Sequence, residues 1–345
     1  MGPKSTTRIG GAMSTTVPAI EARGLTKEFG GARAVDAVDL VVPAGGVFAL
    51  LGTNGAGKTT TVRMLATLLR PDSGDARIFG HDVVAEATAV RSLIGVTGQY
   101  ASVDEDLTAR ENLMIFGRLI GSSRRRARIR ADELLDEFGL GTVATRRVGH
   151  FSGGMRRRLD LAASLITRPR LLFLDEPTTG LDPRTRAQMW QTVRDMVARG
   201  STVLLTTQYL DEADELADHI AVMDRGRVVA DGTADDLKAG VGDMSVRLEL
   251  ADADDLTAAA QVCAPFTSSG EPTIARREGV LVLPMADIDP LADILGALRA
   301  RGLALTSVNV VRPTLDEVFF ALTDGGDPTR TAPAAAEIDS TGVRA

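Results

Sequence analysis

Short, continuous runs of apolar residues recur along the first two thirds of the chain. They occupy residues 46–52 (GVFALLG), 171–175 (LLFLD), 202–207 (TVLLTT) and 220–224 (IAVMD). Runs of this length without polar alternation are typical of strands that are buried on both faces of a sheet. Helical patterns separate them, as at residues 58–70 (KTTTVRMLATLLR). Buried strands that alternate with helices predict an α/β fold with a mostly parallel sheet.

The segment at 58–70 has the spacing of an amphipathic helix. Val62, Leu65 and Leu69 recur at intervals of three and four residues, which places them on one helical face. Pro71 cannot continue a helix. We therefore expect a helix that stops just before Pro71.

Other patterns divide the chain into regions. Residues 19–29 and 34–43 alternate apolar and polar positions as strands do, whereas residues 104–168 have mainly helical patterns and predict an inserted subdomain. After about residue 240 the order is strand, helix, two strands, helix and strand, a βαββαβ pattern that predicts a small separate α+β domain. The expected organisation is a flexible leader (1–18), an α/β domain (19–240), a C-terminal α+β accessory domain (241–323) and a disordered tail (324–345).

Composition narrows the class of protein. The chain has 345 residues, of which 44% are apolar, and its net charge of −7 argues against a nucleic-acid binder that relies on a basic surface. With one cysteine, Cys263, and three histidines, it offers neither an intrachain disulfide nor a Cys/His metal cluster. No apolar stretch approaches the roughly 18 residues needed to cross a bilayer. Any membrane role is therefore expected to come through a partner.

The sequence GTNGAGKTT follows a predicted buried strand and leads into the predicted helix. It matches the pattern G-x-x-x-x-G-K-[ST] in the strand–loop–helix context that this phosphate-binding motif requires. Its glycines let backbone N–H groups converge on phosphate oxygens, and the helix N-terminus adds partial positive charge. Lys58 is expected to reach the β- and γ-phosphates of a nucleotide, and Thr59 to bind Mg²⁺. The predicted cofactor-binding residues of this loop are Gly52, Thr53, Asn54, Gly55, Ala56, Gly57, Lys58, Thr59 and Thr60.

Two carboxylates end the apolar run at 171–175. Asp175 lies at the end of the predicted strand, where it is expected to hold Mg²⁺ through water, and Glu176 follows it. A carboxylate at that position can polarise the water that attacks a phosphate. An acidic loop after a strand is common, but together with the phosphate-binding loop it predicts a nucleotide hydrolase.

A second anion-binding pattern lies at residues 151–160 (FSGGMRRRLD). The hydroxyl of Ser152, the N–H groups that follow it and the helix dipole suit an anion. One chain does not need two such sites for one γ-phosphate, whereas two chains arranged head to tail do. With this motif the sequence resembles the ABC ATPases over roughly residues 19–323. The arginines after the motif, Arg156 to Arg158, are expected on a solvated face or in dimer contacts.

All the motifs occur in the order of that family, ending with GLD (180–182) and TTQYLDEAD (206–214). The resemblance implies an ABC-type P-loop NTPase domain with a RecA-like core, an antiparallel β subdomain and a helical subdomain. It also implies a homodimer that closes around two ATP molecules. In that dimer Ser152, Gly153 and Gly154 of one chain would clamp the γ-phosphate held by the other chain.

The resemblance assigns roles to three more residues. Phe29 would stack on adenine, although a plain core phenylalanine is an even alternative. Gln99 would contact Mg²⁺ and the γ-phosphate and link them to the helical subdomain. Asp182 would lie across the dimer interface, while its position before Pro183 also suits a helix N-cap.

Gln208 stands where most ABC ATPases carry a histidine. An amide can both donate to a γ-phosphate and accept from a water molecule, but it cannot exchange a proton near neutral pH as histidine does. Because the resemblance includes this glutamine, we interpret Gln208 as a catalytic sensor of the γ-phosphate. Proton transfer is then left to Glu176 and water.

Four segments resemble one subfamily of the ABC ATPases. TGQYASVDEDLT, SGGMRRRLD, LLTTQYLDEAD and PTLDEVFFALT are similar to the ATP-binding subunits of daunorubicin/doxorubicin-resistance-type exporters. This implies a peripheral subunit at the cytoplasmic face of the cell membrane, which drives efflux of a hydrophobic drug or natural product through a separate integral membrane subunit. Two alternatives are an ABC-type ATPase that is not coupled to transport and a nucleotide-binding regulator with weak hydrolysis.

Overall fold

The computed structural model describes residues 17–98, 103–240, 244–267, 270–276 and 278–323. The chain divides into two compact units between Leu237 and Lys238. The predicted tail and all but the last two residues of the predicted leader lie outside the described residues.

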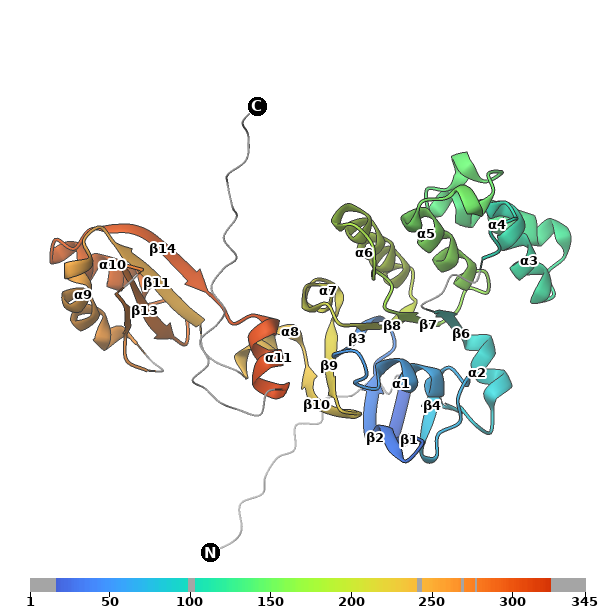
Figure 1. Ribbon diagram of the computed structural model, residues 1–345, viewed down its shortest axis with the longest axis horizontal. Helices are drawn as coiled ribbons and strands as arrows, with labels where there is room; N and C mark the ends of the chain where they lie inside the picture. The colour runs from blue at the N-terminus through green and yellow to red at the C-terminus, as the bar shows by residue number, and fades with distance from the viewer. Residues whose placement is uncertain (1–16, 99–102, 241–243, 268–269, 277, 324–345) are drawn as a thin grey trace, which may run out of the picture. The chain divides into compact units, whose positions relative to one another are not determined.

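The first unit is built around a six-stranded sheet (Figure 1). Neighbouring strands within it are parallel except β10, which pairs antiparallel with β9. The order across the sheet is β10 (Arg227–Gly232), β9 (His219–Asp224), β3 (Gly46–Leu51), β8 (Thr202–Thr207), β7 (Leu171–Asp175) and β6 (Ile94–Thr97). The apolar runs at 171–175 and 202–207 form β7 and β8 with the predicted bounds, and the run at 220–224 lies within β9. The predicted parallel α/β core is therefore confirmed.

A second, antiparallel sheet packs over the first, with helix α1 (Lys58–Leu65) between them (Figure 1). Its strands, in order, are β2 (Ala32–Val42), β1 (Ile20–Phe29), β4 (Ser73–Ile78) and β5 (His81–Asp82). Val62 and Leu65 of α1 join one apolar core with residues from both sheets. α1 ends earlier than predicted, because Thr67 adopts a left-handed conformation (φ 62°) and the N–H groups of Leu68 and Leu69 turn back to the carbonyl of Arg63.

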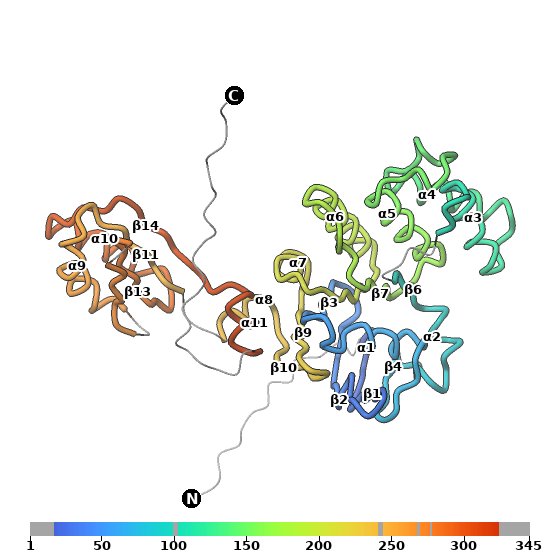
Figure 2. Tube along the Cα trace, viewed as in Figure 1, coloured from blue at the N-terminus to red at the C-terminus, as the bar shows by residue number. Residues whose placement is uncertain are grey.

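The strand register decides which residues meet at the carboxyl edge of the parallel sheet. Leu51 pairs with Thr207, and Asp175 pairs with Thr206. The segments that follow β3, β7 and β8 therefore emerge together, although they are far apart in the sequence (Figure 2). This is the edge at which open α/β sheets bind ligands.

Helices complete the first unit. α3 (Ala109–Leu119), α4 (Arg124–Glu137) and α5 (Gly153–Ser164) pack on one another within the predicted helical subdomain. α5 also contacts β6, while α6 (Pro183–Ala198) and α7 (Leu210–Leu216) contact β8. The N-terminus of α3 is fixed by a capping box between Thr108 and Glu111. α2 (Ala87–Leu93) precedes β6, and α8 (Ala234–Ala239) spans the division between the units.

The second unit contains a four-stranded antiparallel sheet. Its elements follow the predicted βαββαβ order: β11 (Met244–Leu250), α9 (Leu256–Cys263), β12 (Thr273–Ala275), β13 (Val280–Met285), α10 (Leu291–Ala300) and β14 (Leu305–Val311). The apolar side chains of β11, β13, α9 and α10 form its own core. α11 (Leu315–Thr323) follows β14 and buries Leu315 and Val318. Among the described residues of both units, no helix combines the length and the apolar character that a membrane crossing requires.

Candidate nucleotide-binding and catalytic site

The loop between β3 and α1 forms a cradle at the carboxyl edge of the sheet. Gly52 is buried, Thr53, Asn54 and Gly55 form an exposed tip, and Ala56 and Gly57 are buried again before α1 begins at Lys58. Gly57 has a φ of 103°, and a Cβ there would lie 2.5 Å from the carbonyl oxygen of Ala34. Only glycine fits this position, which lets α1 start directly from the loop with its N–H groups facing an incoming anion.

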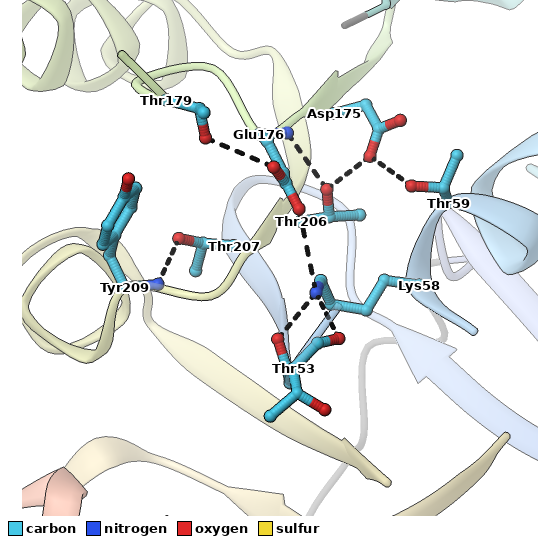
Figure 3. Close-up of polar contacts among 10 residues, drawn as sticks. Thr53, Lys58, Thr59, Asp175, Glu176, Thr179, Thr206, Thr207 and Tyr209 are labelled. Atoms are coloured by element: carbon cyan, nitrogen blue, oxygen red, sulfur yellow. Dashed lines mark hydrogen bonds and ion pairs between the residues drawn. The ribbon is translucent and has the colours of Figure 1, made fainter. Parts of the chain in front are cut away.

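Lys58 points back into the loop (Figure 3). Its Nζ donates to the carbonyl oxygens of Gly52 at 2.6 Å and Thr53 at 3.0 Å, and it lies 3.9 Å from Oε1 of Glu176. Burial lowers the pKa of Lys58, while the carboxylates of Glu176 and Asp175 act in the opposite direction. The structure thus holds an ammonium group between the loop and the end of β7.

Asp175 and Thr59 place two oxygen ligands beside the cradle. Thr59 Oγ1 donates to Asp175 Oδ1 at 3.0 Å, and Thr206 Oγ1 donates to the same oxygen at 2.6 Å (Figure 3). Asp175 is buried at the end of β7, so the hydroxyl of Thr206 on the neighbouring strand fixes its carboxylate. Hydroxyl and carboxylate oxygens are the hard donors that Mg²⁺ prefers.

Glu176 is held in an unusual backbone conformation. Its φ is 48°, a left-handed value that costs about 1–2 kcal/mol for a residue with a Cβ. Its N–H bonds to Thr206 through both the carbonyl oxygen (3.1 Å) and the hydroxyl (3.0 Å). Its carboxylate accepts from the hydroxyl of Thr179 at 3.2 Å and faces Lys58 (Figure 3). The turn therefore aims this carboxylate at the cradle.

Gln208 comes directly after β8 at the same edge of the sheet and is half-buried. The residues on either side of it are joined, because the N–H of Tyr209 donates to Thr207 Oγ1 at 2.9 Å. One turn later, the buried carboxylate of Glu212 accepts from Thr178 Oγ1 at 2.8 Å and from the indole of Trp190 at 3.2 Å. Burial raises the pKa of Glu212. The start of α7 is thus tied to the segment that follows Glu176.

The Ser152–Gly154 motif and Asp182 form a second group of site residues. Ser152 caps α5 by accepting from the N–H of Met155 at 3.3 Å. Asp182 caps α6 by accepting from the N–H (2.9 Å) and hydroxyl (2.7 Å) of Thr185, and these bonds lower its pKa. A Cβ on Gly154 would lie 2.6 Å from Cγ2 of Thr185, so the two helix starts are in close contact. Within the described chain, no hydrogen bond or ion pair joins this group directly to Lys58, Thr59, Asp175 or Glu176.

Phe29 and Gln99 are the two remaining predicted site residues. Phe29 is the last residue of β1 and is 51% exposed, with Nζ of Lys27 5.6 Å from the ring centre. An exposed ring is available for stacking, which a core phenylalanine would not be. Gln99 lies outside the described residues.

Sequence reasoning missed three residues that bond to the segment at the end of β7: Thr179, Thr206 and Arg157. The two threonines bond to Glu176 and Asp175. The sequence predicts Thr206 only as part of a strand and of the motif TTQYLDEAD, and its position beside Asp175 follows from the register of β7 and β8. The sequence predicted either a solvated face or dimer contacts for Arg157. The solvated face is wrong, since 13% of the side chain is exposed, and the dimer contacts stay a prediction.

Comparisons with known proteins show the family to which the chain belongs. The family model described as ABC transporter matches residues 35–179. The chain is 54% identical over 321 residues to the daunorubicin/doxorubicin resistance ATP-binding protein DrrA of Streptomyces peucetius, covering 92% of this chain and 96% of the relative.

Solved structures of the same family match part of the chain. An ATP-binding subunit of an ABC transporter has a TM-score of 0.58 at 29% identity, covering 64% of this chain and 92% of that structure. A dimeric ATP-binding cassette in a post-hydrolysis state, bound to ADP and Pi, has a TM-score of 0.57 at 25% identity. The match covers 62% of this chain and 98% of the chain in that structure. The chain is therefore an ATP-binding ABC transporter ATPase, and within that family it belongs with the daunorubicin/doxorubicin resistance ATP-binding proteins.

Proposed function

We propose that two copies of this chain close head to tail around two Mg²⁺-ATP complexes, and that ATP hydrolysis drives efflux of a hydrophobic drug or natural product. Transport runs through a separate integral membrane subunit, which holds the chain at the cytoplasmic face of the membrane. The observation that carries the proposal is the convergence of Lys58, Thr59, Asp175 and Glu176 on one cradle. The 54% identity to the Streptomyces peucetius resistance protein supports the direction and the class of cargo.

In this mechanism the cradle holds the triphosphate and Lys58 neutralises charge on its β- and γ-phosphates. Thr59, Asp175 and Gln99 are the residues that would hold Mg²⁺, and the first two supply suitable oxygen donors 3.0 Å apart. The bound ion supplies charge neutralisation on the phosphate oxygens. Phe29 stacks on adenine. The Ser152–Gly154 motif and Asp182 act at the dimer interface, where the motif contacts the ATP held by the other copy.

Glu176 is the general base. Its carboxylate accepts a proton from water as the water oxygen bonds to the γ-phosphorus, and the bond from that phosphorus to the bridging oxygen of ADP breaks. The contact between Glu176 and Lys58 supports this role, because it aims the carboxylate at the place where the γ-phosphate would lie. The proton does not pass through residue 208, since a glutamine side chain has no proton to exchange near neutral pH.

Gln208→Ala is expected to lower the ATP turnover number about 10- to 100-fold while changing ATP affinity less than about threefold. A donor to a charged group contributes roughly 1.5–3 kcal/mol, and here that contribution is made to the reacting phosphate. Steady-state hydrolysis and equilibrium binding of ATP by the purified chain measure the two effects. Gln191→Ala on α6, where the amide bonds to Asp195, is the matched control. Turnover equal to wild type would show that Gln208 is only a structural amide.

An apolar groove in the first unit supports contact with the membrane subunit. It has a volume of about 240 Å³ and lies between β6, α3 and α5. Phe116, Leu119 and Ile120 line it, and Leu119 is 78% exposed. A groove of this kind suits an apolar segment of a partner protein. We propose that the membrane subunit binds there.

Ser152→Glu is expected to abolish efflux by cells that co-express the chain with the integral membrane subunit that co-purifies with it. A carboxylate at the start of α5 repels the γ-phosphate of the partner copy and so prevents ATP-dependent closure. Ser123→Glu is the control, because Ser123 caps α4 through the same bond, from the N–H of Arg126 at 3.3 Å. Doxorubicin accumulation in the cells is the measurement.

Two outcomes contradict the proposed transport function. Efflux by the Ser152→Glu variant at the wild-type rate would exclude the head-to-tail dimer as the working form. If no integral membrane subunit co-purifies with the wild-type chain and doxorubicin accumulation is unchanged, the chain is an ATPase that is not coupled to transport.

A further inference from the structure

Arg157 is bound to the backbone of the catalytic segment. Its Nε donates to the carbonyl oxygen of Pro177 at 3.0 Å, and one terminal nitrogen donates to Gly98 at 2.7 Å. The other terminal nitrogen donates to the carbonyl oxygens of Asp175 at 3.1 Å and Glu176 at 3.2 Å. A guanidinium group is the one side chain with enough donors in a fixed fork to hold so many acceptors at once.

The neighbouring arginines behave differently. Arg156 is 31% exposed at its side chain and forms an ion pair with Glu105 at 2.6 Å. Arg158 donates to the carbonyl oxygen of Phe138 within the helical subdomain. In the described residues, only Arg157 of the three bonds to the segment after β7. Three successive arginines therefore have three different environments in the structure.

The acceptors of Arg157 surround Glu176. Asp175, Glu176 and Pro177 present three successive carbonyl oxygens to the same guanidinium group. The left-handed backbone of Glu176, with its φ of 48°, persists only if its surroundings enforce it. Thr206 holds the N–H of Glu176 from one side, and Arg157 holds its carbonyl oxygen from the other.

The charge of Arg157 is balanced by nearby carboxylates. Oδ2 of Asp160, one turn along α5, lies 3.7 Å from a terminal nitrogen of Arg157. Burial lowers the pKa of the guanidinium group, and Asp160, Asp175 and Glu212 oppose that effect. An arginine remains charged under these conditions, so its hydrogen bonds to the carbonyls are charge-assisted.

We propose that Arg157 is a positioning residue for ATP hydrolysis, which fixes the backbone of Glu176 and joins it to the helix that begins at the Ser152–Gly154 motif. The inference rests on the proposed role of Glu176 as the base. Arg157 lies on α5, the helix that Ser152 caps. Its side chain therefore links two parts of the proposed mechanism: the Ser152–Gly154 motif, which contacts the partner copy's ATP, and Glu176, which acts on the chain's own ATP. Gly98, directly before Gln99, is bonded to the same group.

Arg157→Gln tests this positioning role. The turnover number is expected to fall about 10- to 100-fold, whereas ATP affinity changes little. Arg157→Lys keeps the charge but loses the fork, and it is expected to restore part of the lost turnover. Arg156→Gln is the matched control on the same helix and is expected to hydrolyse ATP at the wild-type rate. A parallel loss of affinity and turnover in Arg157→Gln would indicate a merely structural role and overturn the proposal.

A double-mutant cycle separates this inference from the proposed function. If Arg157 acts through Glu176, adding Arg157→Gln to Glu176→Gln produces no further loss of rate in single-turnover hydrolysis of radiolabelled ATP. An independent, multiplicative loss would overturn the inference. If Glu176→Gln alone leaves hydrolysis intact, the proposed base is wrong. If Glu176→Gln abolishes hydrolysis while Arg157→Gln does not slow it, only the positioning role fails. Should Arg157→Gln not fold, the same cycle with Arg157→Lys decides.

Discussion

Glu176→Gln is expected to lower the ATP turnover number of the purified chain by at least about 100-fold. General-base catalysis contributes roughly 10²–10⁴-fold, and an amide cannot accept the proton of the attacking water. The substitution keeps the size of the side chain and its hydrogen-bonding oxygen, so the bond from Thr179 and the fold of the segment are retained. Phosphate release under saturating ATP measures the loss.

A measurement of ATP affinity shows whether this variant has lost the chemical step or the binding of ATP. ATP affinity is expected to stay within about threefold of the wild-type value, because the cradle keeps its residues and Lys58 keeps its bonds to the carbonyl oxygens of Gly52 and Thr53. The variant should then accumulate as an ATP-bound dimer in sedimentation experiments. Glu133→Gln on α4, a carboxylate that pairs with Arg130 at 3.1 Å, is the control and should behave like wild type. Turnover within threefold of wild type in Glu176→Gln would refute the assignment of the base.

Lys58→Ala is expected to weaken ATP binding by about 10- to 150-fold. A hydrogen bond to a charged group contributes roughly 1.5–3 kcal/mol, and every 1.4 kcal/mol changes a dissociation constant tenfold. The buried ammonium group of Lys58 also offsets the negative charge of Glu176 and Asp175. Without it, the two carboxylates repel the phosphates of ATP more strongly. Equilibrium binding of ATP to the purified variant is the measurement.

A control for Lys58→Ala is Lys238→Ala on α8, which removes a lysine outside the cradle. Thermal unfolding in the absence of nucleotide shows whether the Lys58 variant is folded. ATP affinity equal to wild type in a folded Lys58→Ala variant would mean that the loop after β3 does not bind the triphosphate as proposed.

The two predictions address different steps of one cycle. Lys58 is placed by the loop and α1, and Glu176 by β7, so the two side chains meet only because β3, β8 and β7 lie side by side in parallel register. Loss of Lys58 is expected to remove binding energy before any chemistry, whereas loss of Glu176 is expected to leave the complex intact but unable to transfer the proton. A variant set that shows this separation supports both assignments together.

Much of this protein follows from contiguous stretches of the sequence. The buried strands β7 and β8 and the loop from Gly52 to Thr60 are local features, because strand burial and phosphate binding by backbone N–H groups depend on neighbouring residues. The order of the motifs then determined the family, which the relatives confirm. The βαββαβ order of the second unit was likewise readable from apolar periodicity.

The tertiary structure alone decided how these parts are joined. Arg157 has the same sequence signal as its neighbour Arg156, which pairs with Glu105, yet the side chain of Arg157 donates to carbonyl oxygens of the turn after β7. The pairing of Thr206 with Asp175 depends on the register of two strands about thirty residues apart in the chain, which no local pattern encodes. The left-handed turn at Glu176 exists because these distant groups hold it from both sides. The sequence determined which chemical groups are present, and long-range packing determined where the carboxylate of Glu176 points.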